Sequence, residues 1–242
     1  PVQELGIPLL LAGYDLMAFA QTGTGKTAAF LVPIINQILA APKTDGVKAM
    51  IIAPTRELAQ QIEQQLQGFA YYANLSSIAI YGGGNGSSWD YEKKALTKGA
   101  DFIVATPGRL ISHLNMGYVN LKSLKYFVLD EADKMLDMGF LPDIASIIKM
   151  LPEKRQNMMF SATMNPKIKT LAMKILHDPK EVSIAIAKPA EKIVQAAYLV
   201  HEKQKINLLE NLLEDKVDSK LIIFSSRKVT VNEIVKRLQA KK

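Results

Sequence analysis

The residues best suited to chemistry lie in a glycine-rich segment, residues 20–27, which reads AQTGTGKT. An apolar run typical of a buried strand precedes it and a helical pattern follows, so the glycines fall at a strand-to-helix turn. Backbone N–H groups and the positive end of a helix dipole converge there on one anion, and Gly23 and Gly25 let the backbone wrap a phosphate closely. Lys26 can reach the β- and γ-phosphates, and the Thr27 hydroxyl can bind Mg²⁺. The predicted nucleotide site comprises Gln21, Thr22, Gly23, Thr24, Gly25, Lys26 and Thr27.

A second group of chemically capable residues is the acidic run 130–133, which ends an apolar strand pattern. In a phosphate-loop NTPase an Asp at such a strand end holds Mg²⁺, and the next acid can orient and deprotonate the attacking water. Asp130 and Glu131 fit these two roles, and Thr27 with Asp130 forms the candidate metal site. The alternative is a helix N-terminus, where the dipole favours acidic side chains without catalysis. The presence of Lys26 and Thr27 in the same chain favours the catalytic interpretation.

The third candidate is Phe160-Ser161-Ala162-Thr163, at the end of another apolar run. The hydroxyls of Ser161 and Thr163 could donate hydrogen bonds to the carboxylates. From spacing alone, a simple helix cap before Asn165-Pro166 is the favoured interpretation.

These groups need a scaffold that brings distant segments together, and the apolar pattern predicts one. Strand-like runs alternate with helical patterns, and the runs are almost continuously apolar, which is typical of a parallel sheet covered on both faces. The predicted strands span 48–53, 77–81, 102–105, 126–130 and 157–161, and the predicted helices 56–72, 91–98, 107–116, 142–150 and 166–176. Because ligands bind outside the carboxyl ends of such strands, we expect the candidate residues at one edge of an α/β fold.

Composition limits the class of protein and its partners. The absence of Cys excludes disulfides and thiolate metal sites and suits a cytoplasmic protein. No apolar run is long enough to span a membrane, and the N-terminus lacks a signal-peptide pattern. The net charge of +7 favours a polyanionic partner, nucleic acid above all, with a merely soluble basic surface as the alternative.

A domain boundary is expected near residues 185–191, because the pattern restarts there. Beyond it the sequence predicts a strand at 193–200, a helix at 203–213, a strand at 221–225 and a helix at 229–238. A piece of this size buries too little surface to be comfortably stable alone. We therefore expect one domain over residues 1–186, and over 187–242 a linker with the incomplete start of a second α/β domain.

Together these motifs resemble the DEAD-box family of RNA helicases, within helicase superfamily 2, and its bacterial members. Asp130-Glu131-Ala132-Asp133 spells the family name, and the loop with Ala20 in place of the first glycine is the family's own variant. Other motifs occur in the family's order at 54–59, 82–83, 106–109, 135–140 and 161–163. The resemblance implies a RecA-like domain followed by the start of a second RecA-like domain, and activity that depends on ATP and Mg²⁺.

The resemblance also implies residue roles. Gln3 would read the adenine edge, favouring ATP over GTP, although the aromatic residue that the family carries upstream is missing. An exposed helix-start residue is the alternative for Gln3. Ser161 and Thr163 would link ATP hydrolysis to strand separation by bonding Asp133.

RNA contacts are implied for three loops, whose residues are Pro54, Thr55, Arg56, Glu57, Gly82, Gly83, Thr106, Pro107, Gly108 and Arg109. Arg56 and Arg109 can pair with phosphate oxygens, and contacts to the backbone make binding tolerant of RNA sequence. Without the family, 106–109 is only a helix start with Pro at its first position, and Arg56 could pair with a neighbouring acid.

The sequence departs from the family at two places. A Gln usual between Gly83 and Leu96 is missing, and for Trp89 a partly buried position is favoured over stacking on a base. Residues 221–228 resemble the first motif of the second domain, but the later motifs do not follow.

We therefore expect an ATP-dependent RNA helicase that couples ATP hydrolysis to local duplex separation, with weak activity for this piece alone. The alternatives are an ATP-gated RNA clamp or scaffold without unwinding, and a superfamily 2 translocase on DNA.

Overall fold

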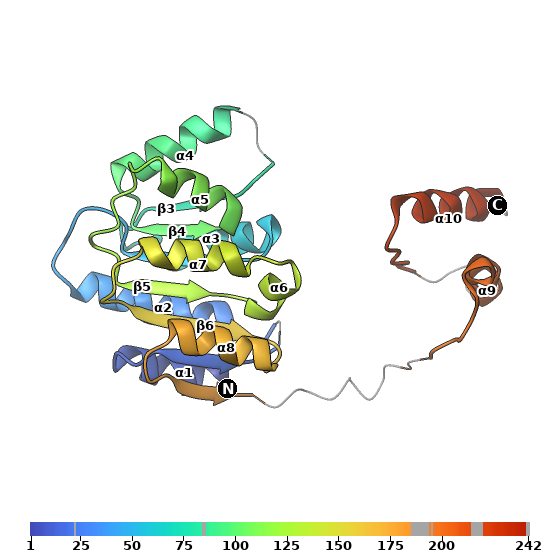
Figure 1. Ribbon diagram of the computed structural model, residues 1–242, viewed down its shortest axis with the longest axis horizontal. Coiled ribbons are helices and arrows are strands. Elements are labelled where there is room, and N and C mark those ends of the chain that lie inside the picture. The colour runs from blue at the N-terminus through green and yellow to red at the C-terminus, as the bar shows by residue number, and fades with distance from the viewer. Residues whose placement is uncertain (22, 84–85, 185–193, 195, 214–219, 241–242) are drawn as a thin grey trace. The chain divides into compact units, whose positions relative to one another are not determined.

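The computed structural model describes residues 1–21, 23–83, 86–184, 194, 196–213 and 220–240. The chain divides into two compact units, Pro1–Ala187 and Lys188–Lys242 (Figure 1). The predicted boundary between residues 186 and 187 lies outside the described residues and stays a prediction.

A seven-stranded sheet in the order β3-β4-β2-β5-β6-β1-β7 forms the centre of the first unit. Every neighbouring pair is parallel, so all strand arrows point the same way in Figure 1. The strands are β1 Leu16–Phe19, β2 Ala49–Ile52, β3 Ser77–Ile80, β4 Phe102–Ala105, β5 Tyr126–Leu129, β6 Gln156–Ser161 and β7 Lys180–Ser183. The parallel sheet predicted from the apolar runs is confirmed; only β7, a polar edge strand, had no signal in the sequence.

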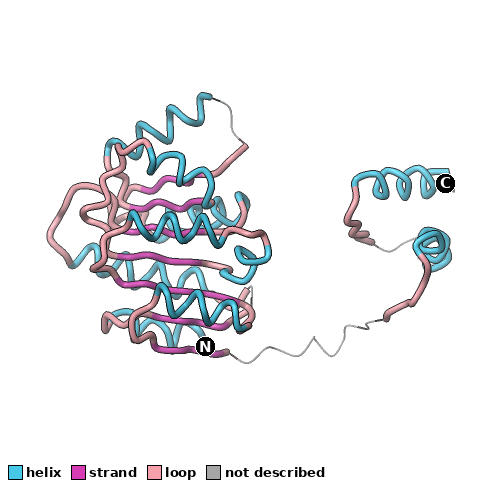
Figure 2. The backbone as a smooth tube through the Cα atoms, in the orientation of Figure 1, coloured by secondary structure: helices cyan, strands magenta, loops and turns pink. Residues whose placement is uncertain are grey.

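Helices cover both faces of this sheet (Figure 2). They are α1 Val2–Leu11, α2 Lys26–Ala40, α3 Arg56–Phe69, α4 Gly86–Lys98, α5 Pro107–Asn115, α6 Ala132–Asp137, α7 Leu141–Met150 and α8 Pro166–Ile175. Helices α1, α2 and α3 pack through Leu10, Phe30 and Ile62 into one core, and α4 to α8 pack into a second core on the opposite face. This is the RecA-like α/β arrangement that the resemblance implies.

The alternation of side chains along each strand explains why two cores form. In β2, Ala49 and Ile51 enter the core of α1–α3, whereas Met50 and Ile52 enter the core of α4–α8. Successive residues of a strand point to opposite faces, so a run buried on both faces must be apolar throughout. Because all strands are parallel, their carboxyl ends share one edge, and the segments that follow β1 to β6 emerge there.

The second unit has a short 3₁₀ helix, Glu202–Gln204, followed by α9 Lys205–Leu213 and α10 Lys228–Ala240. The two helices predicted here are confirmed. The two strands are not: the described residues within 193–200 and 221–225 form no strand, and Leu199 and Phe224 are exposed. A strand must pair its N–H and C=O groups with a neighbour, and none is present among the described residues of this unit. No helix in the described part of the chain is long and apolar enough to cross a bilayer.

Candidate nucleotide site and neighbouring loops

The glycine-rich segment forms a tight loop between β1 and α2. Gly23 and Gly25 both adopt left-handed backbone angles, with φ of 85° and 87°, a region that favours glycine. The Thr24 hydroxyl donates to the Gln21 carbonyl oxygen at 2.7 Å and closes the loop on itself. The loop therefore leads into the N-terminus of α2, where an anion is favoured. Thr22, also predicted to bind the nucleotide, lies outside the described residues.

Lys26, Thr27, Asp130 and Glu131 line one cavity of about 250 Å³, as the sequence predicted they would converge. Lys26 is only 6% exposed, and its Nζ has no hydrogen-bond partner among the described residues. Burying an ammonium group without a partner costs free energy, and an anion bound in the cavity would offset that cost. The phosphates of a nucleotide would supply one.

The Asp130 carboxyl sits at the end of β5 and is almost fully buried. Burial raises its pKa to about 6, although the positive charge of Lys26 acts in the opposite direction. The Glu131 backbone N–H donates to Asp130 Oδ1 at 3.0 Å and fixes the carboxyl group. With the Thr27 hydroxyl in the same cavity, the oxygen ligands fit Mg²⁺, which is commonly held by one or two carboxylates together with phosphates.

Glu131 adopts a left-handed backbone conformation, with φ of 53°, just before α6. Such a conformation is strained in a residue other than glycine and tends to occur at functional sites. Its Oε2 lies 2.8 Å from Lys134 Nζ. The turn brings the Glu131 side chain to the cavity that Lys26 also lines.

Asp133 joins the acidic run to the end of β6. Its Oδ2 accepts hydrogen bonds from the N–H groups of Ala162 and Thr163, at 3.1 and 3.0 Å, and from the Thr163 hydroxyl at 3.2 Å. The expected bond from Thr163 to Asp133 is present. That from Ser161 is not: its hydroxyl donates to the Thr163 carbonyl oxygen at 2.8 Å. Ser161 thus shapes the turn that presents Thr163, and the Ala162 N–H takes the place expected for Ser161.

Gln3, the residue expected to read adenine, lies against the phosphate loop. Its Nε2 donates to the Gly25 carbonyl oxygen at 3.1 Å. A Cβ on residue 25 would come within 2.4 Å of the same nitrogen, so only glycine allows this contact. The structure brings Gln3 to the nucleotide site; its adenine role stays a prediction.

Two further residues of the cavity were not identified from the sequence. Gln61 and Gln65 of α3 line it together with Leu58. They are four residues apart and therefore share one helix face. Their spacing was visible, but nothing in the sequence showed that this face points at the phosphate loop.

The loops expected to contact RNA lie at the same sheet edge. The Arg56 guanidinium lies 5.0 Å from the centre of the Tyr81 ring, and its Nη1 is 3.7 Å from where a Cβ of Gly83 would be. The Thr55 hydroxyl accepts the Leu58 N–H at 3.3 Å and caps α3. The segments 54–57 and 82–83 are therefore neighbours, and Arg56 forms no ion pair with an acid of the described residues.

The third loop, 106–109, begins α5 with Pro107 at its first position, as predicted. The Arg109 side chain turns back toward α4, where its Nε donates to Glu92 Oε2 at 2.9 Å. Trp89 is partly buried, as favoured, and its ring centre lies 4.4 Å from the Arg109 guanidinium carbon. Glu92 was not among the residues predicted from the sequence, because nothing in the sequence distinguishes a buried acid on an otherwise polar helix from an exposed one.

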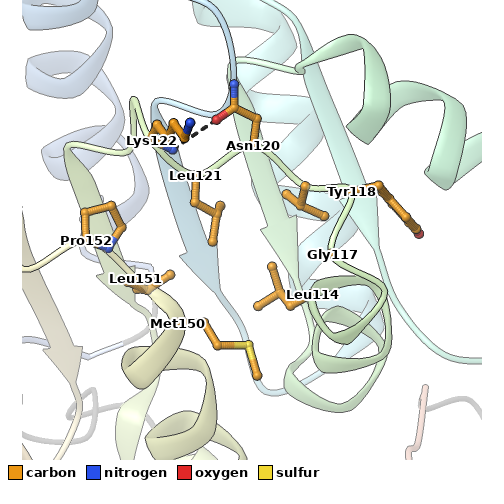
Figure 3. Close-up of a pocket in the computed structure, with 10 residues that line it drawn as sticks. Leu114, Gly117, Tyr118, Asn120, Leu121, Lys122, Met150, Leu151 and Pro152 are labelled. Atoms are coloured by element: carbon orange, nitrogen blue, oxygen red, sulfur yellow. Dashed lines mark hydrogen bonds between the residues drawn. The ribbon is translucent and has the colours of Figure 1, made fainter.

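A larger cavity, of about 660 Å³, lies away from this edge (Figure 3). Its lining comes from the end of α5 and the segment before β5, and from the end of α7 and the segment before β6: Leu114, Gly117, Tyr118, Val119, Asn120, Leu121, Lys122, Met150, Leu151 and Pro152. None of the residues predicted to bind nucleotide or RNA borders it, so its size does not make it the candidate site.

Comparison with known proteins agrees with this geometry. The family model of the DEAD/DEAH box helicases matches residues 1–171. The chain is 40% identical over 239 residues to the ATP-dependent RNA helicase CshA of Listeria monocytogenes, covering 98% of this chain and 45% of that protein. It is 39% identical to the ATP-dependent RNA helicase RhlB of Shewanella baltica, covering 94% of this chain and 53% of that protein.

A crystal structure of a DEAD box protein from the hyperthermophile Methanococcus jannaschii superposes with a TM-score of 0.70 at 37% identity, covering 99% of this chain and 63% of that one. The chain spans about half the length of the curated relatives it matches. Because the family model matches most of its length, the chain belongs to the DEAD/DEAH box helicase family.

Proposed function

We propose that this chain binds ATP with Mg²⁺ at the edge formed by residues 20–27 and 130–131, as part of an ATP-dependent RNA helicase. The observation that carries the proposal is the buried Lys26 Nζ, which has no partner among the described residues and shares a cavity with Asp130 and Glu131. Membership of the DEAD/DEAH box helicase family supports the same activity.

The chemistry would be transfer of the γ-phosphoryl group to water. Lys26 would neutralise charge on the β- and γ-phosphates, and the N–H groups at the start of α2 would hold the phosphate oxygens. Glu131 would accept a proton from the attacking water as its oxygen bonds to phosphorus and the bond to the bridging oxygen breaks. Thr27 and Asp130 would hold Mg²⁺, which supplies charge neutralisation at the same oxygens.

Gln3 would select the base. Its side-chain amide can accept from the adenine N6 amino group and donate to N7, whereas the same edge of guanine offers two acceptors, N7 and O6. The contact between Gln3 and the Gly25 carbonyl oxygen places this amide beside the phosphate loop and supports the role.

The RNA strand would cross the loops that follow β2, β3 and β4. Arg56 supplies a cation, and Gly82 and Gly83 expose backbone to the strand. Contacts of this kind go to phosphate and sugar, so binding should tolerate any base sequence. The bonds from Thr163 and Ala162 to Asp133 supply a physical link between the acidic run and β6 through which ATP hydrolysis could be coupled to duplex separation.

The ATP site is tested by calorimetry with ATP and Mg²⁺. Lys26→Ala should abolish measurable binding, whereas Lys149→Ala, which removes an exposed lysine of α7, should leave affinity unchanged. An unchanged affinity of Lys26→Ala for ATP would refute the site.

The choice of nucleic acid is tested with RNA and DNA strands of matched sequence, where tighter binding to RNA is expected because of the 2′-hydroxyl.

A further inference from the structure

The Arg109 side chain is held between two residues of α4. Its Nε donates to Glu92 Oε2 at 2.9 Å, and its guanidinium carbon lies 4.4 Å from the centre of the Trp89 ring. Its Nη2 is buried and has no hydrogen-bond partner within the described part of the chain. The whole side chain is 19% exposed. The position of Arg109 is therefore fixed by the charge and the hydrogen bond of Glu92 and by the aromatic face of Trp89.

Glu92 is itself fixed from the other side by His113 of α5. His113 Nε2 lies 2.7 Å from the same Glu92 Oε2, and its ring stacks on Trp89 with centres 3.9 Å apart. Burial lowers the pKa of His113. A neutral ring near pH 7 would donate from Nε2 to Glu92 and accept the Tyr118 hydroxyl proton at Nδ1. Arg109 is then the cation that balances the Glu92 carboxylate.

This arrangement limits how Arg109 can meet a phosphate. A two-pronged contact needs two N–H groups on one edge of the guanidinium. Nε already donates to Glu92, and Nη2 is buried, so neither edge that contains Nη2 is open in this conformation.

We propose that Arg109 is a positioning residue for RNA binding: Glu92 and Trp89 hold it inward, and it fixes the first turn of α5 so that residues 106–108 face the strand. This role rests on the proposed function, that the chain binds RNA. A positioning role and a phosphate contact predict opposite changes in RNA affinity when the Glu92 charge is removed. If Arg109 gripped a phosphate, Glu92 would compete for it, and removing its charge would tighten RNA binding. If Arg109 positions the turn, removing the carboxylate loosens the turn and weakens binding.

The test is a titration of a labelled oligouridylate by fluorescence anisotropy, over a range of salt concentrations. Glu92→Gln should weaken RNA binding roughly tenfold, within the range for coupled residues in contact. Asp90→Asn is the matched control, because it removes one negative charge from an exposed position on the same helix. It should leave affinity unchanged or slightly tighter. Tighter binding by Glu92→Gln, as in the control, would overturn the positioning role.

Arg109→Ala and Arg109→Lys separate the two roles further. Both should weaken RNA binding with an unchanged salt slope, because lysine lacks the plane and the Nε that the site uses. A phosphate contact would give a different result. Arg109→Lys would then keep its affinity for RNA, and Arg109→Ala would reduce the log–log salt slope by about 0.7. In the Arg109→Ala background, Glu92→Gln should have no further effect, because Glu92 acts through Arg109.

Two controls guard against misfolding and against failure of the premise. ATP affinity by calorimetry should stay unchanged in Glu92→Gln, since the nucleotide cavity is lined by other residues. The emission of Trp89, the single tryptophan of the sequence, should change in Glu92→Gln and on adding RNA to the unaltered chain. If the unaltered chain binds no RNA, the proposed function fails and this role with it. If it binds RNA and Glu92→Gln binds more tightly, the positioning role alone fails.

Discussion

Asp133 and Thr163 are joined twice: one carboxylate oxygen of Asp133 accepts both the backbone N–H of Thr163, at 3.0 Å, and its hydroxyl, at 3.2 Å. The same oxygen accepts the Ala162 N–H at 3.1 Å. The end of β6 is thus tied to the acidic run after β5 mainly through backbone groups. Side-chain changes at Asp133 and at Thr163 should therefore have unequal effects.

Asp133→Ala should destabilise the fold more than Thr163→Val. Removing the carboxylate takes the acceptor from the Ala162 N–H and leaves the Thr163 N–H only its 3.4 Å contact to the Ser161 hydroxyl oxygen, at a cost of about 2 kcal/mol, whereas Thr163→Val removes one bond worth about 1 kcal/mol. Urea unfolding of both variants measures the difference. Equal losses would show that the backbone bonds to Asp133 contribute little.

Stability should depend on pH through Asp130. Its pKa is raised to about 6 in the fold, from 3.8 for an unperturbed Asp. Between about pH 4 and pH 6 the unfolded chain therefore releases this proton before the folded chain does, and stability falls as pH rises, by on the order of 2–3 kcal/mol. Asp130→Asn should remove this fall, so the difference between the two proteins, measured by urea unfolding, isolates it from other carboxyls. Parallel pH curves would contradict the raised pKa.

The sequence predicted the site better than it predicted the contacts around it. Lys26 and Asp130 meet because alternating strands and helices force a parallel sheet, whose strand ends share one edge. The pairing of Arg109 with Glu92 depends on how α4 packs beside α5, which no local pattern contains. The described residues within the strands predicted at 193–200 and 221–225 form no strand, because an apolar run becomes a strand only when a neighbour pairs with it.

Arg56 should behave as a phosphate contact, in contrast to the positioning role proposed for Arg109. It is exposed, and it lies beside Gly83. Arg56→Gln should weaken RNA binding and reduce the log–log salt slope by about 0.7, the contribution of one phosphate on a single strand. Anisotropy titrations at several salt concentrations provide the slope. A slope equal to that of the unaltered chain would place Arg56 outside the RNA contact.

Glu131 should show a trade-off between stability and turnover. Glu131→Asn should relieve about 0.5–1 kcal/mol of backbone strain, because Asn tolerates the left-handed backbone better than Glu does. Glu131→Gln also loses the ion pair to Lys134 but keeps the strain, so urea unfolding of Glu131→Asn beside Glu131→Gln isolates this gain. In the full-length protein, Glu131→Gln should keep ATP binding and abolish turnover. Phosphate release at an undiminished rate would remove Glu131 as the general base.

Gly23 and Gly25 form a matched pair in the phosphate loop. Both have a left-handed backbone, so alanine at either should cost about 1–2 kcal/mol in strain. A Cβ at residue 23 meets nothing within 4 Å, whereas at residue 25 it comes within 2.4 Å of the Gln3 amide nitrogen. Gly25→Ala should therefore displace the Gln3 amide and lose more of the preference for ATP over GTP than Gly23→Ala does, while the two variants lose similar stability because the exposed Gln3 side chain can move aside. The comparison of the two variants by urea unfolding and by calorimetry with both nucleotides checks this. Equal preferences for ATP over GTP in the two variants would mean that the contact between Gln3 and Gly25 has no part in reading the base.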